Sequence, residues 1–107
     1  MADFVHARDW EQFHSPKNVS MALAVEASEL MELFQWADTN GSQEIVRTQR
    51  EKVEQELADV LSYVLAMANT CDIDLTDAFM RKLALNAAKY PIEKAKGKSD
   101  KYHSYQK

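Results

Sequence analysis

The 107-residue sequence has very few of the residues that make tight turns, with two glycines and two prolines. An all-β protein needs several tight turns between its strands, so this scarcity favours long helices. Cys71 is the only cysteine, so no internal disulfide can form. The sequence also lacks an apolar run of the roughly 20 residues that span a bilayer, and its first residues lack the pattern of an export signal. We therefore expect a single all-α, cytoplasmic protein with no membrane partner.

The formal net charge of -4 is unevenly distributed along the chain. Residues 1–93 carry 8 Lys and Arg against 16 Asp and Glu, whereas residues 94–107 carry 5 Lys and a single Asp. Binding to duplex nucleic acid depends on a basic face that contacts phosphates, so the acidic body argues against such a partner. We expect a helical domain over residues 1–91 and a Lys-rich C-terminal tail over residues 92–107.

Residues that start and stop helices divide the sequence into four expected helices. Ser15 is a good N-cap, and Pro16 suits the first helical position, where its missing N–H costs nothing. Gly41 is a stop signal, and Ser42 can cap the helix that follows. Asp74 can cap the last helix. The expected helices cover residues 3–14, 16–37, 42–69 and 75–90.

Acidic residues interrupt the apolar stripes of the second and third expected helices. At about 100° per residue, Glu26 and Glu29 fall in the middle of the apolar face of the second helix. On the third helix Glu56 lies within the edge of the apolar side and Asp59 just outside it, whereas Glu51 points to the solvated side. The residues expected on that buried side are Val46, Val53, Leu57, Val60, Val64 and Met67.

The two acidic pairs lie at nearly the same height if the two helices form an antiparallel pair. Their midpoints are about 14 residues before and about 16 residues after the expected turn at Gly41, at roughly 1.5 Å rise per residue. Four anions in a partly buried site need a strong compensating charge. Because the ligands are all oxygens, Mg²⁺ or Mn²⁺ suits them better than Zn²⁺. The sequence therefore predicts a metal site made by Glu26, Glu29, Glu56 and Asp59.

Two alternatives compete with a metal site. The acids could face solvent because the helices are tilted, or they could pair with Lys or Arg across the bundle. The matching height of two acidic pairs favours the metal site over both. Glu32 lies at the flank of the stripe and could act through water or simply lie at the surface.

The last expected helix carries groups that suit phosphates. Lys82, Asn86 and Lys89 recur at i, i+4 and i+7. Lys supplies point charge and Asn supplies directed donors, so this strip resembles a polyphosphate grip. The alternative is an ordinary solvated helix face.

Aromatic residues near the helix ends could contact a nucleoside. The rings of Trp10 and Trp36 can stack on a base, and His14 can hydrogen-bond to it. Tyr63, one turn after Asp59, could touch a sugar or a phosphate. Packing in the core or at an interface is the alternative for the aromatic rings.

Four segments of the chain resemble the MazG-like nucleoside triphosphate pyrophosphohydrolases, and within that family the short dCTP pyrophosphatase type. The paired Glu-x-x-Glu and Glu-x-x-Asp motif is the most specific part of this resemblance. The segments are RDWEQFH (residues 8–14), LAVEASELMELFQW (residues 23–36), ELADVLSY (residues 56–63) and KLALNAAKYP (residues 82–91).

The resemblance implies a four-helix, all-α chain with antiparallel helix pairs that assembles into an oligomeric bundle, as a homodimer or a dimer of dimers. It also implies Mg²⁺ dependence and cleavage between the α- and β-phosphates. The residues to which the resemblance assigns a role are Glu26, Glu29, Glu56 and Asp59 for the metal, Lys82 and Asn86 for phosphates, and Trp10, Trp36 and Tyr63 for the nucleoside.

These features predict an enzyme that hydrolyses a (deoxy)nucleoside triphosphate to the monophosphate and pyrophosphate. The expected substrate is dCTP or a related or modified dNTP, and the expected role is removal of unwanted nucleotides from the pool. Glu26 or Glu29 would act as the base for the attacking water. The rival interpretation is a non-catalytic, dimeric helical module whose acidic strip docks a basic partner; Mg²⁺ dependence distinguishes the two.

Overall fold

The structure is a computed structural model that describes residues 2–90, and every regular element in that range is a helix. The predicted all-α class is confirmed, whereas the predicted tail over residues 92–107 lies outside the described residues. No helix within residues 2–90 is both long enough and apolar enough to cross a bilayer. The elements are α1 (Ala2–Ala7), the 3₁₀ helix η1 (Glu11–Phe13), α2 (Pro16–Glu32), α3 (Thr39–Thr48), α4 (Arg50–Thr70) and α5 (Leu75–Lys89).

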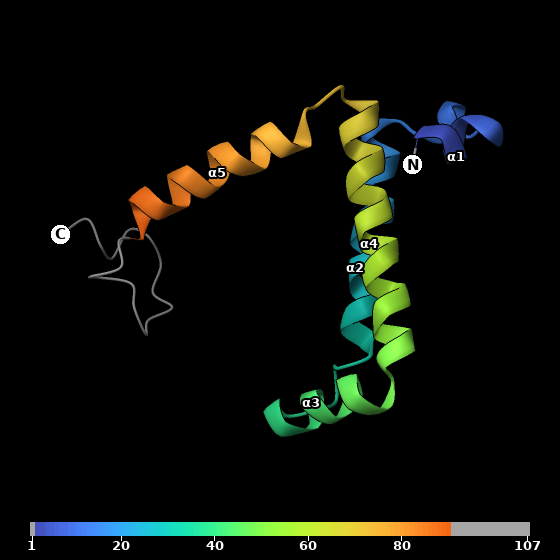
Figure 1. Cartoon of the computed structure of the whole chain (residues 1–107). Helices are drawn as coiled ribbons and strands as arrows, with labels where there is room; N and C mark the ends of the chain where they lie inside the picture. Colours follow the sequence, from blue (N-terminus) through green and yellow to red (C-terminus); the bar gives the residue numbers. More distant parts are fainter. Residues whose placement is uncertain (1, 91–107) are drawn as a thin grey trace. The chain divides into compact units, whose positions relative to one another are not determined.

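The chain divides into two compact units, Met1–Ile73 and Asp74–Lys107. In the first unit α2 and α4 lie side by side and run in opposite directions, and they make the main interhelical packing (Figure 1). α3 packs more sparsely against α4. The described part of the second unit is α5. The antiparallel pairing expected from the heights of the acidic residues is therefore present in α2 and α4.

The buried core of the first unit is small. Its buried apolar residues are Val5, Val19, Ala66 and Ala68, and Val19 is the large side chain that is buried almost completely. Leu57 was expected on the buried side of its helix, but its exposed fraction is 56%. The expected burial of Leu57 is wrong because α2 covers only part of the apolar side of α4. The rest of that side faces outward from this unit.

The predicted caps of two helices are present. The Ser15 side chain accepts a hydrogen bond from the backbone N–H of Asn18, and Pro16 occupies the first turn of α2. The Asp74 side chain accepts a hydrogen bond of 3.0 Å from the backbone N–H of Asp77 at the start of α5. Each cap satisfies one of the N–H groups that a helix start leaves without an intrahelical acceptor.

The first helix is shorter than expected, because it ends at Ala7 instead of continuing to residue 14. Asp9 adopts a left-handed conformation with φ 55°. The N–H of Trp10 donates to the carbonyl of Val5 at 3.0 Å, and the N–H of Asp9 donates to the carbonyl of His6 at 3.0 Å. This pair of hydrogen bonds is the Schellman arrangement, which closes a helix end. Its left-handed residue is an aspartate, so no glycine marks the stop in the sequence.

The end of α4 repeats the same arrangement. Asp72 has φ 54°, the N–H of Ile73 donates to the carbonyl of Ala68 at 2.8 Å, and the N–H of Asp72 donates to that of Asn69 at 3.3 Å. Two of the helices in the first unit therefore end at a left-handed aspartate.

The second helix also ends earlier than expected, at Glu32 instead of Ala37. Beyond it the N–H of Phe34 donates to the carbonyl of Met31 at 2.9 Å, and the N–H of Ala37 donates to that of Phe34 at 3.0 Å. Such three-residue spacing marks a tighter turn than the α-helix. Trp36 thus lies in a turn after α2 and not on the helix.

The expected stop at Gly41 is wrong. Asp38 is the N-cap of α3, and its Oδ1 accepts a hydrogen bond of 2.7 Å from the N–H of Gly41, so Gly41 lies in the first turn of a helix. A Cβ at Gly41 would lie 3.1 Å from that same Oδ1. Gly41 thus allows the close approach of the cap, and Ser42, expected to be the cap, is inside the helix.

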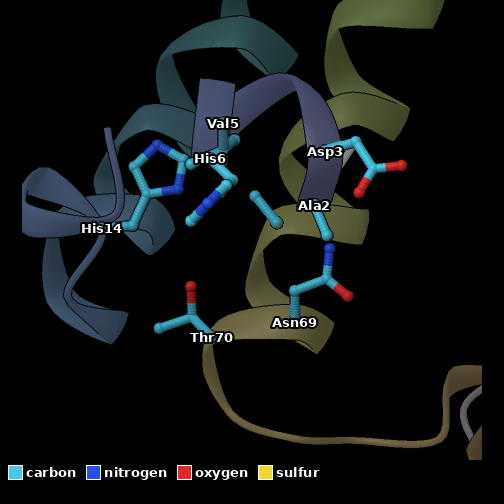
Figure 2. A pocket seen from close by; sticks show the side chains of 8 residues that line it. Ala2, Asp3, Val5, His6, His14, Asn69 and Thr70 are labelled. Atoms are coloured by element: carbon cyan, nitrogen blue, oxygen red, sulfur yellow. The ribbon is translucent and has the colours of Figure 1, made fainter. Parts of the chain in front are cut away.

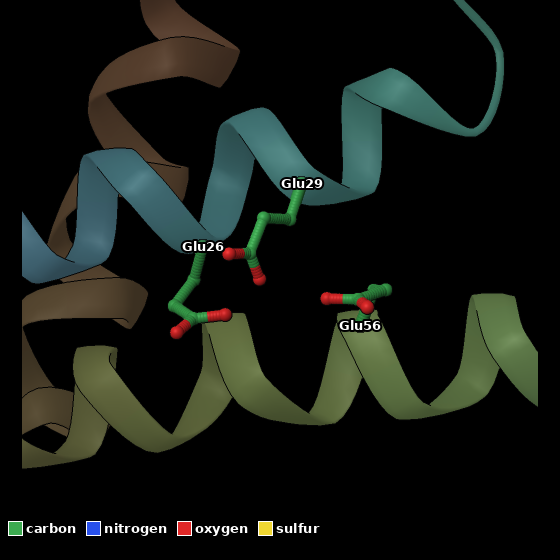
Figure 3. Close-up of side chains that lie close together, drawn as sticks. All are labelled: Glu26, Glu29 and Glu56. Atoms are coloured by element: carbon green, nitrogen blue, oxygen red, sulfur yellow. The ribbon is translucent and has the colours of Figure 1, made fainter.

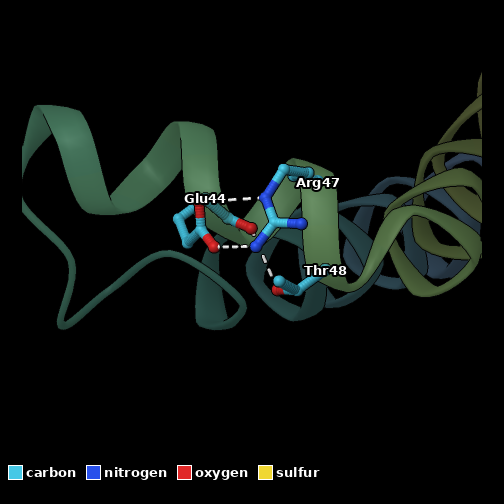
Figure 4. Close-up of polar contacts among 3 residues, drawn as sticks. All are labelled: Glu44, Arg47 and Thr48. Carbon is cyan, nitrogen blue, oxygen red and sulfur yellow. Dashed lines mark hydrogen bonds and ion pairs between the residues drawn. The ribbon is translucent and has the colours of Figure 1, made fainter.

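The third expected helix is divided into α3 and α4 at Gln49, so the described chain has five α-helices and not four. Gln49 has φ -123° and ψ 37°, outside the helical range. Just before it, the Thr48 hydroxyl donates to the carbonyl of Glu44 at 2.9 Å, and Glu44 pairs with Arg47 (Figure 4). The break contains neither glycine nor proline, so no residue type in the sequence marks it.

Candidate active site

Three carboxylates meet between α2 and α4. Glu26 and Glu29 lie one turn apart on α2, and Glu56 projects toward them from α4 (Figure 3). One carboxylate oxygen of each residue lies within 4.8 Å of the corresponding oxygens of the other two. All three side chains are half-buried. The i, i+3 spacing and the antiparallel pairing thus bring together three of the four predicted metal ligands.

Two oxygens of this cluster have no hydrogen-bond partner. Oε2 of Glu26 and Oε2 of Glu56 are buried and accept no hydrogen bond. Oε1 of Glu56 lies 3.9 Å from Nζ of Lys52, one turn earlier on α4. The Lys52 side chain is 57% exposed, so water screens much of its charge. A single, distant ammonium does not compensate three carboxylates that share one site.

Burial raises the pKa of the Glu26 carboxyl above its usual range. The hydrogen-bonding contact and the charge of Glu29 raise this pKa further, and the charges of Asp59 and Glu56 add to the effect. Each cause disfavours the ionised form of Glu26, so the protein alone makes a poor environment for this anion. A cation bound among these carboxylates would reverse the electrostatic part of the shift.

Asp59 lies beside the three-carboxylate cluster and not within it. It is exposed, one turn after Glu56 on α4, and it is close enough for its charge to act on Glu26. Glu32 lines a cavity of about 540 Å³ together with Glu29 and Glu56, so it borders the cluster from the C-terminal end of α2.

The donor set fits a hard divalent cation. It consists of carboxylate oxygens from Glu26, Glu29 and Glu56, with Asp59 adjacent, and two of these oxygens are buried without a partner. Mg²⁺ and Mn²⁺ prefer oxygen ligands and are commonly held by a few carboxylates plus substrate phosphates.

Three of the predicted nucleoside-binding residues line one pocket of about 270 Å³. Trp10, His14 and Tyr63 face it, Phe13 and Asn18 complete its polar and aromatic wall, and Val19 and Ala22 form its apolar floor. Tyr63 lies one turn after Asp59 on α4. The aromatic pocket and the carboxylate cluster thus share α2 and α4. A stacked base needs such an aromatic wall with a few hydrogen-bonding groups.

A second pocket of about 540 Å³ also includes His14. It lies between α1 and the C-terminal end of α4, and His6, Asn69 and Thr70 supply its polar groups (Figure 2). His14 therefore lines both pockets.

Four further predicted binding residues lie on other segments of the chain. Trp36 lies in the turn after α2 with an exposed fraction of 91%, so it is not part of the core of this chain. Lys82, Asn86 and Lys89 share one face of α5 at the predicted i, i+4 and i+7 spacing, in the second unit. Their role toward the carboxylate cluster remains a prediction.

A sequence model of the MazG-like family matches residues 21–104, more than half of the chain. The chain belongs to the MazG-like family. The matched range contains the whole carboxylate cluster of this MazG-like chain, together with Tyr63 and the strip on α5. The family resemblance inferred from the sequence motifs is confirmed.

Named relatives agree with this family. This MazG-like chain is 44% identical over 103 residues to dCTP pyrophosphatase 1 of Mus musculus and 43% identical over 103 residues to dCTP pyrophosphatase 1 of Homo sapiens. Each alignment covers 94% of the chain and 61% of the relative, so the chain spans about three fifths of the length of these curated relatives. The crystal structure of a pyrophosphatase from Archaeoglobus fulgidus matches with a TM-score of 0.81 and 35% identity, covering 84% of each chain.

Two residues of the MazG-like site were missed by the sequence reasoning. Lys52 pairs with Glu56, and its signal was the i, i+4 spacing of opposite charges on one helix. Asn18 lines the aromatic pocket, and its side-chain Nδ2 donates to the carbonyl of Phe13 at 3.4 Å. No periodic pattern singles out Asn18, because its place in the pocket depends on the turn between η1 and α2.

Proposed function

We propose that this protein hydrolyses a (deoxy)nucleoside triphosphate to the monophosphate and pyrophosphate, with Mg²⁺, or alternatively Mn²⁺, as cofactor. The observation that carries the proposal is the cluster of Glu26, Glu29 and Glu56, with its two buried oxygens that lack partners. Relatives named dCTP pyrophosphatase 1 support dCTP, or a related or modified dNTP, as the substrate. Such an activity would remove unwanted nucleotides from the pool before polymerases use them.

The carboxylate cluster would hold the divalent cation through Glu26, Glu29 and Glu56, with Asp59 completing the set. The bound cation supplies positive charge against the phosphate oxygens. Glu26 or Glu29 accepts a proton from the water that attacks the α-phosphorus. A bond forms between the water oxygen and the α-phosphorus, the bond to the α,β-bridging oxygen breaks, and pyrophosphate leaves.

The aromatic pocket would hold the nucleoside. Trp10 stacks on the base, His14 hydrogen-bonds to its edge, and Tyr63 contacts the sugar or a phosphate. Lys82, Asn86 and Lys89 on α5 hold the outgoing phosphates, as point charges and a directed amide donor. Stacking accepts any base, so selectivity for cytosine would come from the hydrogen-bonding groups, His14 and Asn18 among them.

The test is a panel of the common (d)NTPs incubated with the protein and Mg²⁺, with monophosphate and pyrophosphate both quantified. We expect equal amounts of the two products, and no turnover once the metal is chelated. Glu56→Gln and Asp59→Asn should abolish turnover, whereas the matched control Glu51→Gln, an exposed acid on the same helix, should retain it.

Three results would contradict the proposal: orthophosphate as the main product, hydrolysis that survives chelation, or no hydrolysis of any nucleotide in the panel. The last result would favour the non-catalytic helical module instead. Circular dichroism of each variant controls for loss of fold.

A further inference from the structure

Trp10 is held at its backbone but not by burial of its ring. Its N–H donates to the carbonyl of Val5, a residue with 6% exposure, so the main chain is fixed to the core. Trp10 as a whole keeps 42% of its surface exposed, so burial alone does not fix the orientation of its ring. It nevertheless forms a wall of the aromatic pocket, opposite groups contributed by α2 and α4. Something other than the core must therefore set the orientation of the ring.

Phe4 on α1 and Arg8 just after it contact the Trp10 ring. The Phe4 ring meets it edge to face, with 5.5 Å between centroids and 69° between planes. The guanidinium carbon of Arg8 lies 3.8 Å from the Phe4 centroid and 5.9 Å from the Trp10 centroid. The Arg8 Nη1 also donates to the carbonyl of Phe4 at 3.1 Å, which holds the guanidinium over the rings.

We propose that Arg8 and Phe4 are positioning residues that hold the Trp10 ring in place as the wall of the nucleoside pocket. The inference rests on the proposed function for its effect on catalysis. Edge-to-face packing and cation–π attraction both depend on orientation, so together they favour one position of a half-exposed ring. A ring already in position loses less freedom when a base stacks on it, which lowers the cost of binding. Neither Phe4 nor Arg8 lines the aromatic pocket. Any effect of these two residues on nucleoside binding would therefore be exerted through Trp10.

The primary test compares KM and kcat for dCTP among wild type, Arg8→Met, Arg8→Lys and a control. Methionine keeps much of the length of the side chain and removes its charge, whereas lysine keeps a cation. The control is Arg50→Met, which removes an exposed arginine from the start of α4. We expect Arg8→Met to raise KM roughly two- to five-fold with kcat nearly unchanged. Arg8→Lys should recover part of this loss, and Arg50→Met should show none.

A double-mutant cycle with Trp10→Leu separates positioning from direct contact. If Arg8 acts through the ring, Arg8→Met should add nothing once the ring is removed, and the two effects should be non-additive. Full additivity would mean that Arg8 meets the substrate itself, and the inference would be overturned. An unchanged KM in the single variant Arg8→Met, in an enzyme that does hydrolyse dCTP, would also overturn it.

A spectroscopic test does not depend on activity. In a Trp36→Phe background Trp10 is the only tryptophan, so its emission reports its own surroundings. We expect Arg8→Met to shift this emission to longer wavelength and to increase quenching by acrylamide, with Arg8→Lys between it and wild type. Identical spectra and quenching in all three proteins would reject the positioning role. A protein inactive on every nucleotide but with the expected spectral change would refute the proposed function and leave the positioning role supported.

Discussion

Glu26 is the residue where charge and folding are most clearly in conflict. Its pKa is raised by burial and by neighbouring Glu29, Asp59 and Glu56, and one of its oxygens is buried without a partner. A site tuned only for stability would carry an uncharged residue here. A carboxylate in such a position is expected of a ligand whose value lies in binding and not in the stability of the metal-free protein.

We predict that Glu26→Gln stabilises the metal-free protein at neutral pH, by about 0.5–2 kcal/mol. Because the pKa of Glu26 is higher in the folded state than in the unfolded state, protonation favours folding. That contribution is fully present below the unfolded-state pKa and is lost as pH rises through the folded-state pKa. Glu26→Gln should therefore become more stable than wild type as pH rises from the unfolded-state pKa of Glu26 to its folded-state pKa. Thermal melts of both proteins in the presence of a chelator measure this difference.

Glu32→Gln is the matched control for this prediction, because Glu32 borders the cluster without belonging to it. Its melting temperature should change less than that of Glu26→Gln. Added Mg²⁺ should raise the melting temperature of wild type more than that of Glu26→Gln, since a ligand that binds the folded state stabilises it. A variant that melts below wild type without metal would contradict this account of Glu26.

Trp36 is a large aromatic residue that is almost fully exposed. Its 91% exposure shows that it is not packed in the core of the first unit, which was one of the alternatives to base stacking. We predict that Trp36→Ala raises KM for dCTP about ten-fold with a smaller change in kcat, because stacking on a base contributes roughly 1–3 kcal/mol. Steady-state kinetics measures this. If KM is unchanged while the variant dissociates more readily into monomers, the ring belongs to an interface between copies.

At the scale of elements, the sequence predicted the helix starts better than the helix ends. Ser15 with Pro16, and Asp74, are caps whose chemistry can be read directly from the residue types. The end of the first helix before Asp9 was not predicted, because most aspartates are not left-handed and the residue type alone does not mark a helix end. The end of α4 at Thr70, by contrast, lies within one residue of the expected position. The meeting of Glu26, Glu29 and Glu56 was predicted in spite of these errors. It depends on the i, i+3 spacing and on the antiparallel pairing of two helices, and errors of a few residues at the helix ends change neither.

The cap at Asp38 provides an element-scale prediction. Asp38→Ala should destabilise the protein by about 1 kcal/mol, because the N–H of Gly41 loses its acceptor at the start of α3. Asp38→Asn keeps an acceptor oxygen and should cost much less. Chemical denaturation of the three proteins measures the difference. Equal stability of wild type and Asp38→Ala would mean that α3 contributes little to the cooperative unfolding of the first unit.

At the scale of the whole molecule, too much apolar surface remains outside the core. On α2 and α4, large apolar side chains with more than half of their surface exposed are Met21, Val25, Met31, Leu57 and Leu61. On α5 they are Phe79, Met80 and Leu85, and Leu83 is half exposed. Exposed apolar surface of this extent typically marks an interface. These residues support the expectation of a homodimer or a dimer of dimers.

We predict that the protein sediments at no less than twice the 12.3 kDa of the chain at micromolar concentration. Leu61→Glu, which places a charge in the exposed apolar arc of α4, should shift the equilibrium toward monomer. The control is Arg50→Glu, which also places a negative charge on α4 but lies at its exposed start and away from the carboxylate cluster. A wild-type protein that sediments as a monomer would contradict the prediction.

The two left-handed aspartates have a consequence for which substitutions the chain can tolerate. Asp9 and Asp72 end α1 and α4 at positions usually filled by glycine, so these two helix ends form without a glycine. Neither side chain belongs to the carboxylate cluster. In a library that samples every amino acid at each position, these two acids should accept glycine and asparagine and reject valine and isoleucine. Their tolerance profile should thus follow backbone geometry and not charge, in contrast to Glu26, Glu29 and Glu56, where selection for activity should retain the carboxylate.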